Sequence, residues 1–167
     1  MACAITAGYT FDCREAVGGL RNIYVSKLAS AVVVFDVNNI VTSITGVSFY
    51  KYALNTRFAN SFTETFNASA ENGTLFYTQE LSTQFTTITS VNQVLFNTLS
   101  KARMLVVIET NNGELLLMGE RNGALVNGGT ASTGAAFGDF QGYTITLDAQ
   151  QKTPAVALSS IAAITVI

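Results

Sequence analysis

Hydrophobic and polar positions alternate most regularly between residues 58 and 88, and this stretch is predicted to form one long β-hairpin. The strongest local signal is Asn72-Gly73, because a type I′ turn requires positive φ at both central residues and this dipeptide tolerates it well. A two-residue turn there places Glu71 opposite Thr74. At roughly 3.3 Å per residue, each arm is about 45 Å long, which is more than a compact domain of this size needs.

The predicted register sorts the side chains of the hairpin onto two unlike faces. Successive residues of a strand point to opposite sides, so cross-strand partners share a face. One face is mostly apolar and aromatic, with Glu64 as an exception that the pattern leaves unexplained. The other face is small and polar, and its predicted members are Ser61, Thr63, Thr65, Asn67, Thr78, Glu80, Ser82 and Gln84. A slip of one residue would mix the two faces, so the turn and the pattern agree.

The hairpin region also lacks cations. Residues 58–100 contain no Lys or Arg, and their only charged side chains are Glu64, Glu71 and Glu80. Two interpretations fit such a hairpin. It could be a ribbon over a β-sandwich with its polar face in solvent. It could also join the hairpins of neighbouring subunits in a closed barrel whose polar face lines a channel, since closure removes exposed strand edges.

The remaining segments mostly follow strand periods. Strands are predicted at 21–25, 31–35, 40–44, 46–54, 104–110, 115–118, 142–147 and 161–167, with further turns at Asn112-Gly113 and Asn122-Gly123. The continuous apolar runs at 31–35, 104–110 and 115–118 are typical of buried strands. Residues 127–138, rich in Gly, Ala, Ser and Thr, are predicted to form a loop.

One helix is predicted near residues 91–102. Ser90 followed three residues later by Gln93 forms a capping box. Lys101 and Arg103 lie at the other end, where cations complement the helix dipole. Apolar residues at helical spacing predict a stripe that packs on the core: Val91, Val94, Leu95, Leu99 and Ala102. The predicted fold is therefore mainly β, an antiparallel sandwich or barrel with a long hairpin and one main α-helix, forming a single domain over residues 1–167.

Composition indicates a surface that partners cover. The 167 residues are 49% hydrophobic and only 12% charged, about half the usual charged share of roughly 25%. With so few charged residues, electrostatic repulsion between neighbouring copies is weak. The net charge of −2 argues against a nucleic-acid-binding surface. The N-terminus has no basic region before an apolar run and no segment is long enough to span a bilayer, so no signal peptide and no membrane insertion are expected.

The residues that would build an enzyme are missing from the sequence. There is no His, and Cys3 and Cys13, either bridged or free, make a poor metal set without it. The glycine-rich segment contains no Lys, and its glycines do not fit a dinucleotide-binding spacing. Asp139 and Asp148 flank a predicted strand, where carboxylates usually act as solvated caps. We therefore expect no catalysis, no cofactor and no metal.

Three blocks of sequence carry a resemblance to a known family. The first is Asp12-Cys13 with residues 18–25, and the second runs from Asn72-Gly73-Thr74 to residues 80–82. The third combines residues 122–134, Gly138-Asp139 and residues 142–147. Together, along nearly the whole chain, they resemble structural proteins of tailed bacteriophages, and most closely the major tail tube proteins.

This resemblance implies a specific assembly. Tail tube subunits form hexameric rings in which each copy adds strands to an inner β-barrel, with the helix outside. The rings stack around a tape measure protein, and DNA later passes through without specific binding. The polar row of the hairpin would face the lumen, whose anionic, Lys-free wall repels phosphate. Residues expected at subunit or ring contacts are Glu71, Asn72, Gly73, Gly128, Gly129 and Gly134.

The implied partners are further copies of the chain, the tape measure protein, a tail terminator and baseplate or tail-tip proteins. The implied location is the virion tail, after assembly in the host cytoplasm. Two alternatives remain open. One is another virion β-sandwich, such as a head decoration protein, a tail terminator or the inner tube of a contractile injection system. The other is a small enzyme or ligand-binding sandwich, which would need a polar-lined pocket.

Overall fold

The computed structural model describes residue 8 and residues 16–167, so Cys3, Asp12 and Cys13 lie outside the described residues. The fold is mainly β, with 51% strand and 8% helix, antiparallel sheets and a single α-helix among the described residues, which confirms the predicted fold class. In chain order the elements are β1 (Leu20–Lys27), β2 (Val32–Phe35), β3 (Val41–Thr45), β4 (Tyr50–Ala53), β5 (Ser61–Ser69), β6 (Thr74–Thr86), α1 (Ser90–Leu99), β7 (Met104–Thr110), β8 (Leu115–Met118), β9 (Leu125–Ser132), β10 (Gly142–Gln151), β11 (Val156–Ala157) and the 3-10 helix η1 (Ile161–Ala163).

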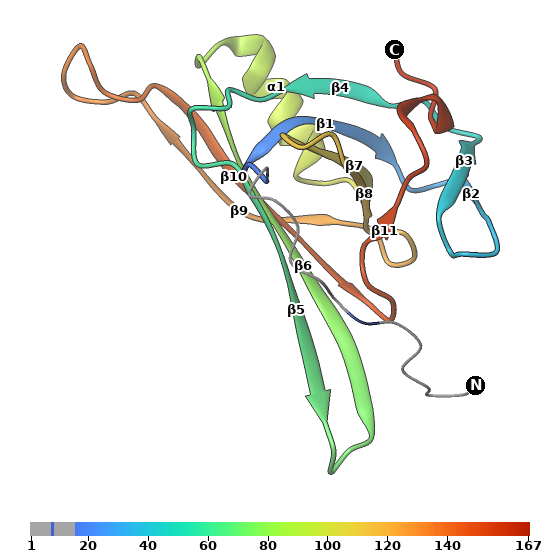
Figure 1. Cartoon of the computed structure of the whole chain (residues 1–167). Helices are drawn as coiled ribbons and strands as arrows, with labels where there is room; N and C mark the ends of the chain where they lie inside the picture. The colour runs from blue at the N-terminus through green and yellow to red at the C-terminus, as the bar shows by residue number, and fades with distance from the viewer. Residues whose placement is uncertain (1–7, 9–15) are drawn as a thin grey trace.

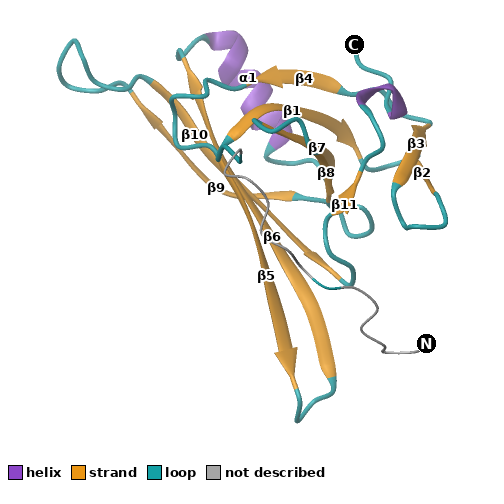
Figure 2. Cartoon of the chain, viewed as in Figure 1, coloured by secondary structure: helices purple, strands orange, loops and turns teal. Residues whose placement is uncertain are grey.

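Two sheets form the body of the molecule, and β2 and β3 make a separate small hairpin. The five-stranded sheet has the order β11-β8-β7-β1-β4, and the four-stranded sheet has the order β5-β6-β10-β9. The β5–β6 hairpin projects far beyond the rest of the chain, and α1 lies toward the opposite end of the molecule (Figure 1). Nearly all of the projecting part is strand, ending in a short turn (Figure 2).

The five-stranded sheet is buried on both faces. Its inner face contributes Ile23, Val106 and Ile108 to a core shared with Leu81 and Ile145 of the four-stranded sheet. Its other face packs against β3 and the C-terminal segment in a second cluster, whose members include Tyr24, Leu105, Val107, Leu117, Phe49 and Ile164. The apolar runs at 104–110 and 115–118 thus have the burial that their sequence predicts.

The hairpin keeps its predicted faces but has a different turn. Ser69 pairs with Thr74 and Ser61 pairs with Ser82, so Glu71 does not face Thr74. Gly73 has a positive φ of 61°, whereas Asn72 is not among the described residues with positive φ, so the turn is not type I′. The register is shifted by two residues from the prediction (Ser82 in place of Gln84 opposite Ser61). A shift of two leaves every side chain on the same face.

Glu64, the exception on the apolar face, accepts two hydrogen bonds at the base of the projecting hairpin. Its Oε2 accepts from the Ala155 backbone N–H at 2.6 Å and from Gln79 Nε2 at 3.0 Å. Gln79 is only 1% exposed, and its Oε1 accepts from the Gly119 N–H at 3.1 Å. Glu64 and Gln79 are also cross-strand partners. This network fixes the hairpin to the loops after β8 and before β11.

The helix begins one residue earlier than the sequence predicts, and its apolar stripe is rotated. Thr89 is the N-cap and its hydroxyl accepts from the Asn92 N–H, so the predicted Ser90/Gln93 capping box is wrong. Val91 and Val94 are 74% and 67% exposed instead of buried. Of the predicted stripe, Leu99 and Ala102 pack on the core as expected, and Phe96 packs there with them. Lys101 and Arg103 follow the helix, whose last turn contains no basic residue.

Three further strand predictions are wrong. Residues 127–138 are not all loop, because β9 occupies their first half through its pairing with β10. Residues 161–167 form the 3-10 helix η1 and then a single bridge from Val166 to Phe49 instead of a strand. The apolar run at 31–35 is a strand but is not buried, since Val32 and Val34 are 57% and 46% exposed.

The Glu64 network yields a stability prediction. Glu64→Ala should lower the free energy of unfolding by about 1–3 kcal/mol, because it removes the hydrogen-bond acceptor of the Ala155 N–H and of the buried Gln79 amide. Urea denaturation measures this change. Glu71→Ala, which removes an exposed carboxylate from the turn of the same hairpin, is the matched control and should change stability by less than about 0.5 kcal/mol. Equal effects of the two substitutions would show that the network does not anchor the hairpin.

Candidate assembly surface

The outward face of the four-stranded sheet is mostly polar on all four strands, and we call it the polar face. Its polar and glycine members are Ser61, Thr63, Thr65 and Asn67 on β5, Thr78, Glu80, Ser82 and Gln84 on β6, Thr144, Thr146, Asp148 and Gln150 on β10, and Gly128, Thr130 and Ser132 on β9. The register also places two exposed apolar residues on this face, Phe76 opposite Asn67 and Leu125 opposite Asp148. None of them is buried. Asn67 Nδ2 donates to Thr78 Oγ1 at 2.9 Å across two strands of this face. All eight hairpin residues predicted to share one face therefore do so.

The polar face extends beyond the residues that the sequence analysis identified. The β10 contribution was missed, although Thr144, Thr146, Asp148 and Gln150 alternate with Ile145, Leu147 and Ala149 at the period of a half-buried strand. Asp148 lies inside β10 and so is not a cap at the end of a strand, as the sequence had predicted.

The polar face is anionic. Asp148 and Glu80 are direct cross-strand partners on β10 and β6. The four strands contain no Lys or Arg, so neither carboxylate has a cation beside it on these strands. Like charges directly opposite each other destabilise a sheet. The Glu80–Asp148 pair therefore lowers the stability of the isolated subunit. Its presence needs a reason other than the stability of the fold.

The two outer strands of this sheet are β5 and β9, and among the described residues each pairs on one side only. The predicted contact residues Gly128 and Gly129 lie on the β9 edge. A Cβ at Gly129 would meet the Thr144 carbonyl oxygen at 3.0 Å, whereas a Cβ at Gly128 would meet nothing. An unpaired strand edge is a template for pairing with another chain.

The loop between β9 and β10 is held in shape by Asp139. Its Oδ2 accepts from the backbone N–H groups of Ala135 and Ala136, both at 2.8 Å, and these bonds lower the pKa of the Asp139 carboxyl. Gly134, the third glycine predicted at a contact, lies in this loop with φ of 69°. It is thus separated from Gly128 and Gly129, which lie within β9.

The turn of the projecting hairpin carries the remaining predicted contacts. Glu71, Asn72 and Gly73 are all exposed at its end. Beside them on the apolar face, Phe66 and Leu75 are 69% and 55% exposed. The Phe66 ring packs edge-on against Tyr77, with ring centroids 5.3 Å apart. The tip thus combines one carboxylate with large apolar side chains in solvent.

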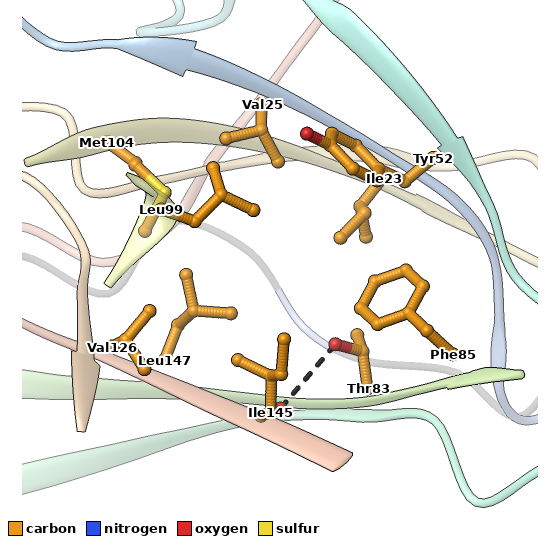
Figure 3. Close-up of a pocket in the computed structure, with 10 residues that line it drawn as sticks. All are labelled: Ile23, Val25, Tyr52, Thr83, Phe85, Leu99, Met104, Val126, Ile145 and Leu147. Carbon is orange, nitrogen blue, oxygen red and sulfur yellow. Dashed lines mark hydrogen bonds between the residues drawn. The ribbon is translucent and has the colours of Figure 1, made fainter. Parts of the chain in front are cut away.

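The interior offers little space for a ligand. A cavity between the two sheets and α1 has a volume of about 20 Å³ and is lined almost entirely by apolar side chains (Figure 3). Its Thr83 hydroxyl donates to the Ile145 carbonyl oxygen at 3.5 Å. Such a volume holds about one water molecule.

A polar cleft of about 430 Å³ lies beside Tyr24 and Glu109, at the far face of the five-stranded sheet. The Glu109 Oε2 accepts from Asn22 Nδ2 at 2.6 Å and from the Tyr24 hydroxyl at 2.9 Å. Burial, and then the hydrogen bond and charge of Glu109, raise the pKa of Tyr24 to about 12. The Glu109 carboxylate therefore acts as a structural hydrogen-bond acceptor for Asn22 and Tyr24. The described residues contain no group of three or more His, Cys, Asp or Glu that could hold a metal ion.

Comparison of the chain with family models, curated proteins and solved structures gave no match. Within the described part of the chain, no helix is both long and apolar enough to cross a membrane. The case for a function therefore depends on the geometry of the polar face, its two edges and the projecting hairpin.

The Glu80–Asp148 pair yields a second prediction. Glu80→Lys should raise the free energy of unfolding of the isolated subunit by about 0.2–1 kcal/mol, because it replaces a repulsive cross-strand pair by an attractive one. Thermal or urea unfolding at low salt measures the change. Gln84→Lys is the control, since its partner on β10 is the uncharged Thr144. A loss of stability with Glu80→Lys alone would contradict the exposed placement of this face.

Proposed function

We propose that the chain is a virion structural protein, a tail tube subunit whose copies close into rings and stack around a channel. The observation that carries the proposal is the four-stranded sheet itself: it has a polar, cation-free outer face and one unpaired edge on each side. This role would explain the unfavourable Glu80–Asp148 pair, because both carboxylates add negative charge to a channel wall along which DNA must slide.

Lateral assembly would proceed by pairing of edges. The β9 edge of one copy pairs with the β5 edge of the next, so that the four-stranded sheets continue from subunit to subunit. Such a contact joins two different surfaces, and repeated rotation about an axis closes it into a ring. Closure leaves no free edge on the four-stranded sheet. The resemblance to tail tube proteins supports six copies per ring.

In the closed ring the polar face lines the lumen. A wall with carboxylates and no Lys or Arg does not gain affinity for DNA through counterion release, so DNA passes without being retained. Before ejection the same lumen would hold a tape measure protein, and the ends of the tube would meet a tail terminator and a baseplate or tail tip. The chain would act in the virion tail and carry out no catalysis.

Electron microscopy of the purified full chain tests this proposal. We expect rings with a central channel, stacked into tubes. A monomer or a small oligomer without a channel at every concentration would contradict it and would favour a decoration role instead.

Proline on the β9 edge should block ring closure. The N–H groups of a strand point alternately to either side, so Thr130→Pro and Ala131→Pro are made in parallel. At one of these two positions the N–H points away from β10. Proline there removes only the outward N–H and leaves the hydrogen bonds to β10 in place. That variant, identified by a melting temperature close to that of the original chain, should remain monomeric in sedimentation. Normal rings from both variants would show that β9 is not the lateral edge.

Cations in the lumen should make the tube retain DNA. In tubes carrying Glu80→Lys and Ser82→Lys, we expect duplex DNA to be retained at low salt and released as salt rises, whereas original tubes retain none. Co-sedimentation of tubes with labelled DNA measures this. Val37→Lys, on the exposed loop between β2 and β3, adds a cation outside the polar face and is the control. Equal retention by the control tubes would contradict the placement of the polar face in the lumen.

A further inference from the structure

The tip of the projecting hairpin exposes large apolar side chains that no other described segment of the subunit covers. On the apolar face Phe66 is 69% exposed and Leu75 55%, and on the polar face Phe76 is 40% exposed opposite Asn67. Beyond the Phe66–Tyr77 pair the hairpin consists, among the described residues, only of β5 and β6, since β10 reaches no further than Tyr77 of β6. Water therefore surrounds both of its faces. Exposed aromatic side chains that gather at one place typically mark a contact surface.

A cleft large enough to receive side chains of the tip lies at the other end of the same sheet. It has a volume of about 290 Å³ and lies between α1, the end of β6 and the segment before β5. Its apolar lining includes Leu54, Phe58, Leu95 and Phe96, and Asn55 and Asn92 supply polar groups. Pockets for small ligands occupy about 300–1,000 Å³. This cleft is just below that range and suits one or two inserted side chains.

The cleft and the tip lie at opposite ends of the hairpin. The cleft contacts Gln84 and Thr86 at the last residues of β6, whereas the tip precedes its first residues. Figure 1 shows α1 and the hairpin turn far apart along the long axis of the molecule. A contact between the tip of one copy and the cleft of another therefore joins unlike surfaces. Repeated along the axis, such a contact generates an open-ended stack.

Charge also matches between the two ends. Glu71 lies at the turn, and no Lys or Arg occurs anywhere in residues 58–100. At the cleft, Arg57 is exposed between Asn55 and Phe58, which both line it. The tip thus carries a carboxylate beside its apolar residues, and the segment that lines the cleft carries the exposed cation Arg57.

We propose that the hairpin tip of one copy inserts Phe66 and Leu75 into the cleft beside α1 of a second copy in the next ring, with Glu71 near Arg57 of that copy. The proposal rests on the proposed function for the existence of rings and names the surface on which they stack. Lateral closure uses the backbone edges of β5 and β9, whereas stacking uses the side chains of Phe66 on β5 and Leu75 on β6, so side-chain substitutions at the tip leave the backbone pairing groups in place.

Two variants separate these contacts. The tip variant, Phe66→Ser with Leu75→Ser, removes exposed apolar groups. The cleft variant, Ala53→Trp, fills the cleft from an exposed position that lines it. Val37 is wholly exposed on another loop, so Val37→Ser and Val37→Trp are the matched controls. We expect both variants to form rings whose mean stack length is at least tenfold shorter than that of the original chain, while both controls form full tubes.

Mixing the two variants gives the most informative result. Rings of the tip variant still have open clefts, and rings of the cleft variant still have intact tips. The mixture should therefore form pairs of rings that grow no further, because each pair presents only altered surfaces at its ends. Pairs formed by the cleft variant alone would show that tip meets tip, which overturns the proposal.

The outcomes also separate the stacking surface from the proposed function. Full tubes from the tip variant would overturn the docking and leave the proposed function standing, whereas absence of rings from the original chain would overturn both. A photo-reactive benzoylphenylalanine in place of Phe66, which preserves an aromatic ring, gives a second measurement in assembled tubes. Cross-links to residues 52–58 or 92–96 of another copy are expected, and cross-links only to other segments would contradict the proposal.

Discussion

The staggered pairing of β6 determines the shape of this protein. From Tyr77 to Thr86 this strand pairs with β10, and from Thr74 to Ser82 it pairs with β5. The part shared with β10 is fixed to the body through Leu81 and Thr83, both fully buried. The first residues, Thr74 to Phe76, have no neighbouring strand but β5 among the described residues and extend into solvent. One strand thus joins the core, the polar face and the projecting tip, and the placement of all three depends on its register.

The fold class and the two faces of the hairpin could be predicted from the sequence because both follow from side-chain period. The turn could not. A register shifted by two residues places every side chain on the same face, so the alternation that defines the faces does not distinguish Ser82 from Gln84 as the partner of Ser61. Glu64 remained unexplained because the donors to its carboxylate come from Ala155 and Gln79, and the Gln79 amide is in turn fixed by Gly119. Contacts between distant segments leave no local pattern.

Tertiary pairing also explains why β9 and the helix face were predicted wrongly. Gly128 and Gly129 favour a loop by propensity, but pairing with β10 makes them part of an edge strand. On α1, Val91 and Val94 match a buried stripe by spacing, yet Phe96 occupies the core beside Tyr143, with ring centroids 4.6 Å apart. The low charge of the chain is consistent with these exposed apolar residues, because both features are typical of a surface that contacts partner proteins.

The central claim is that the polar face lines a closed channel. A cryo-electron microscopy reconstruction of the assembled tube tests it most directly, because it shows at once which strands pair between subunits and which side chains reach the lumen. The account predicts hydrogen bonds between β9 of one subunit and β5 of the next, with Glu80 and Asp148 facing the axis. A tube in which these carboxylates face outward, or in which the two edges remain unpaired, would contradict it.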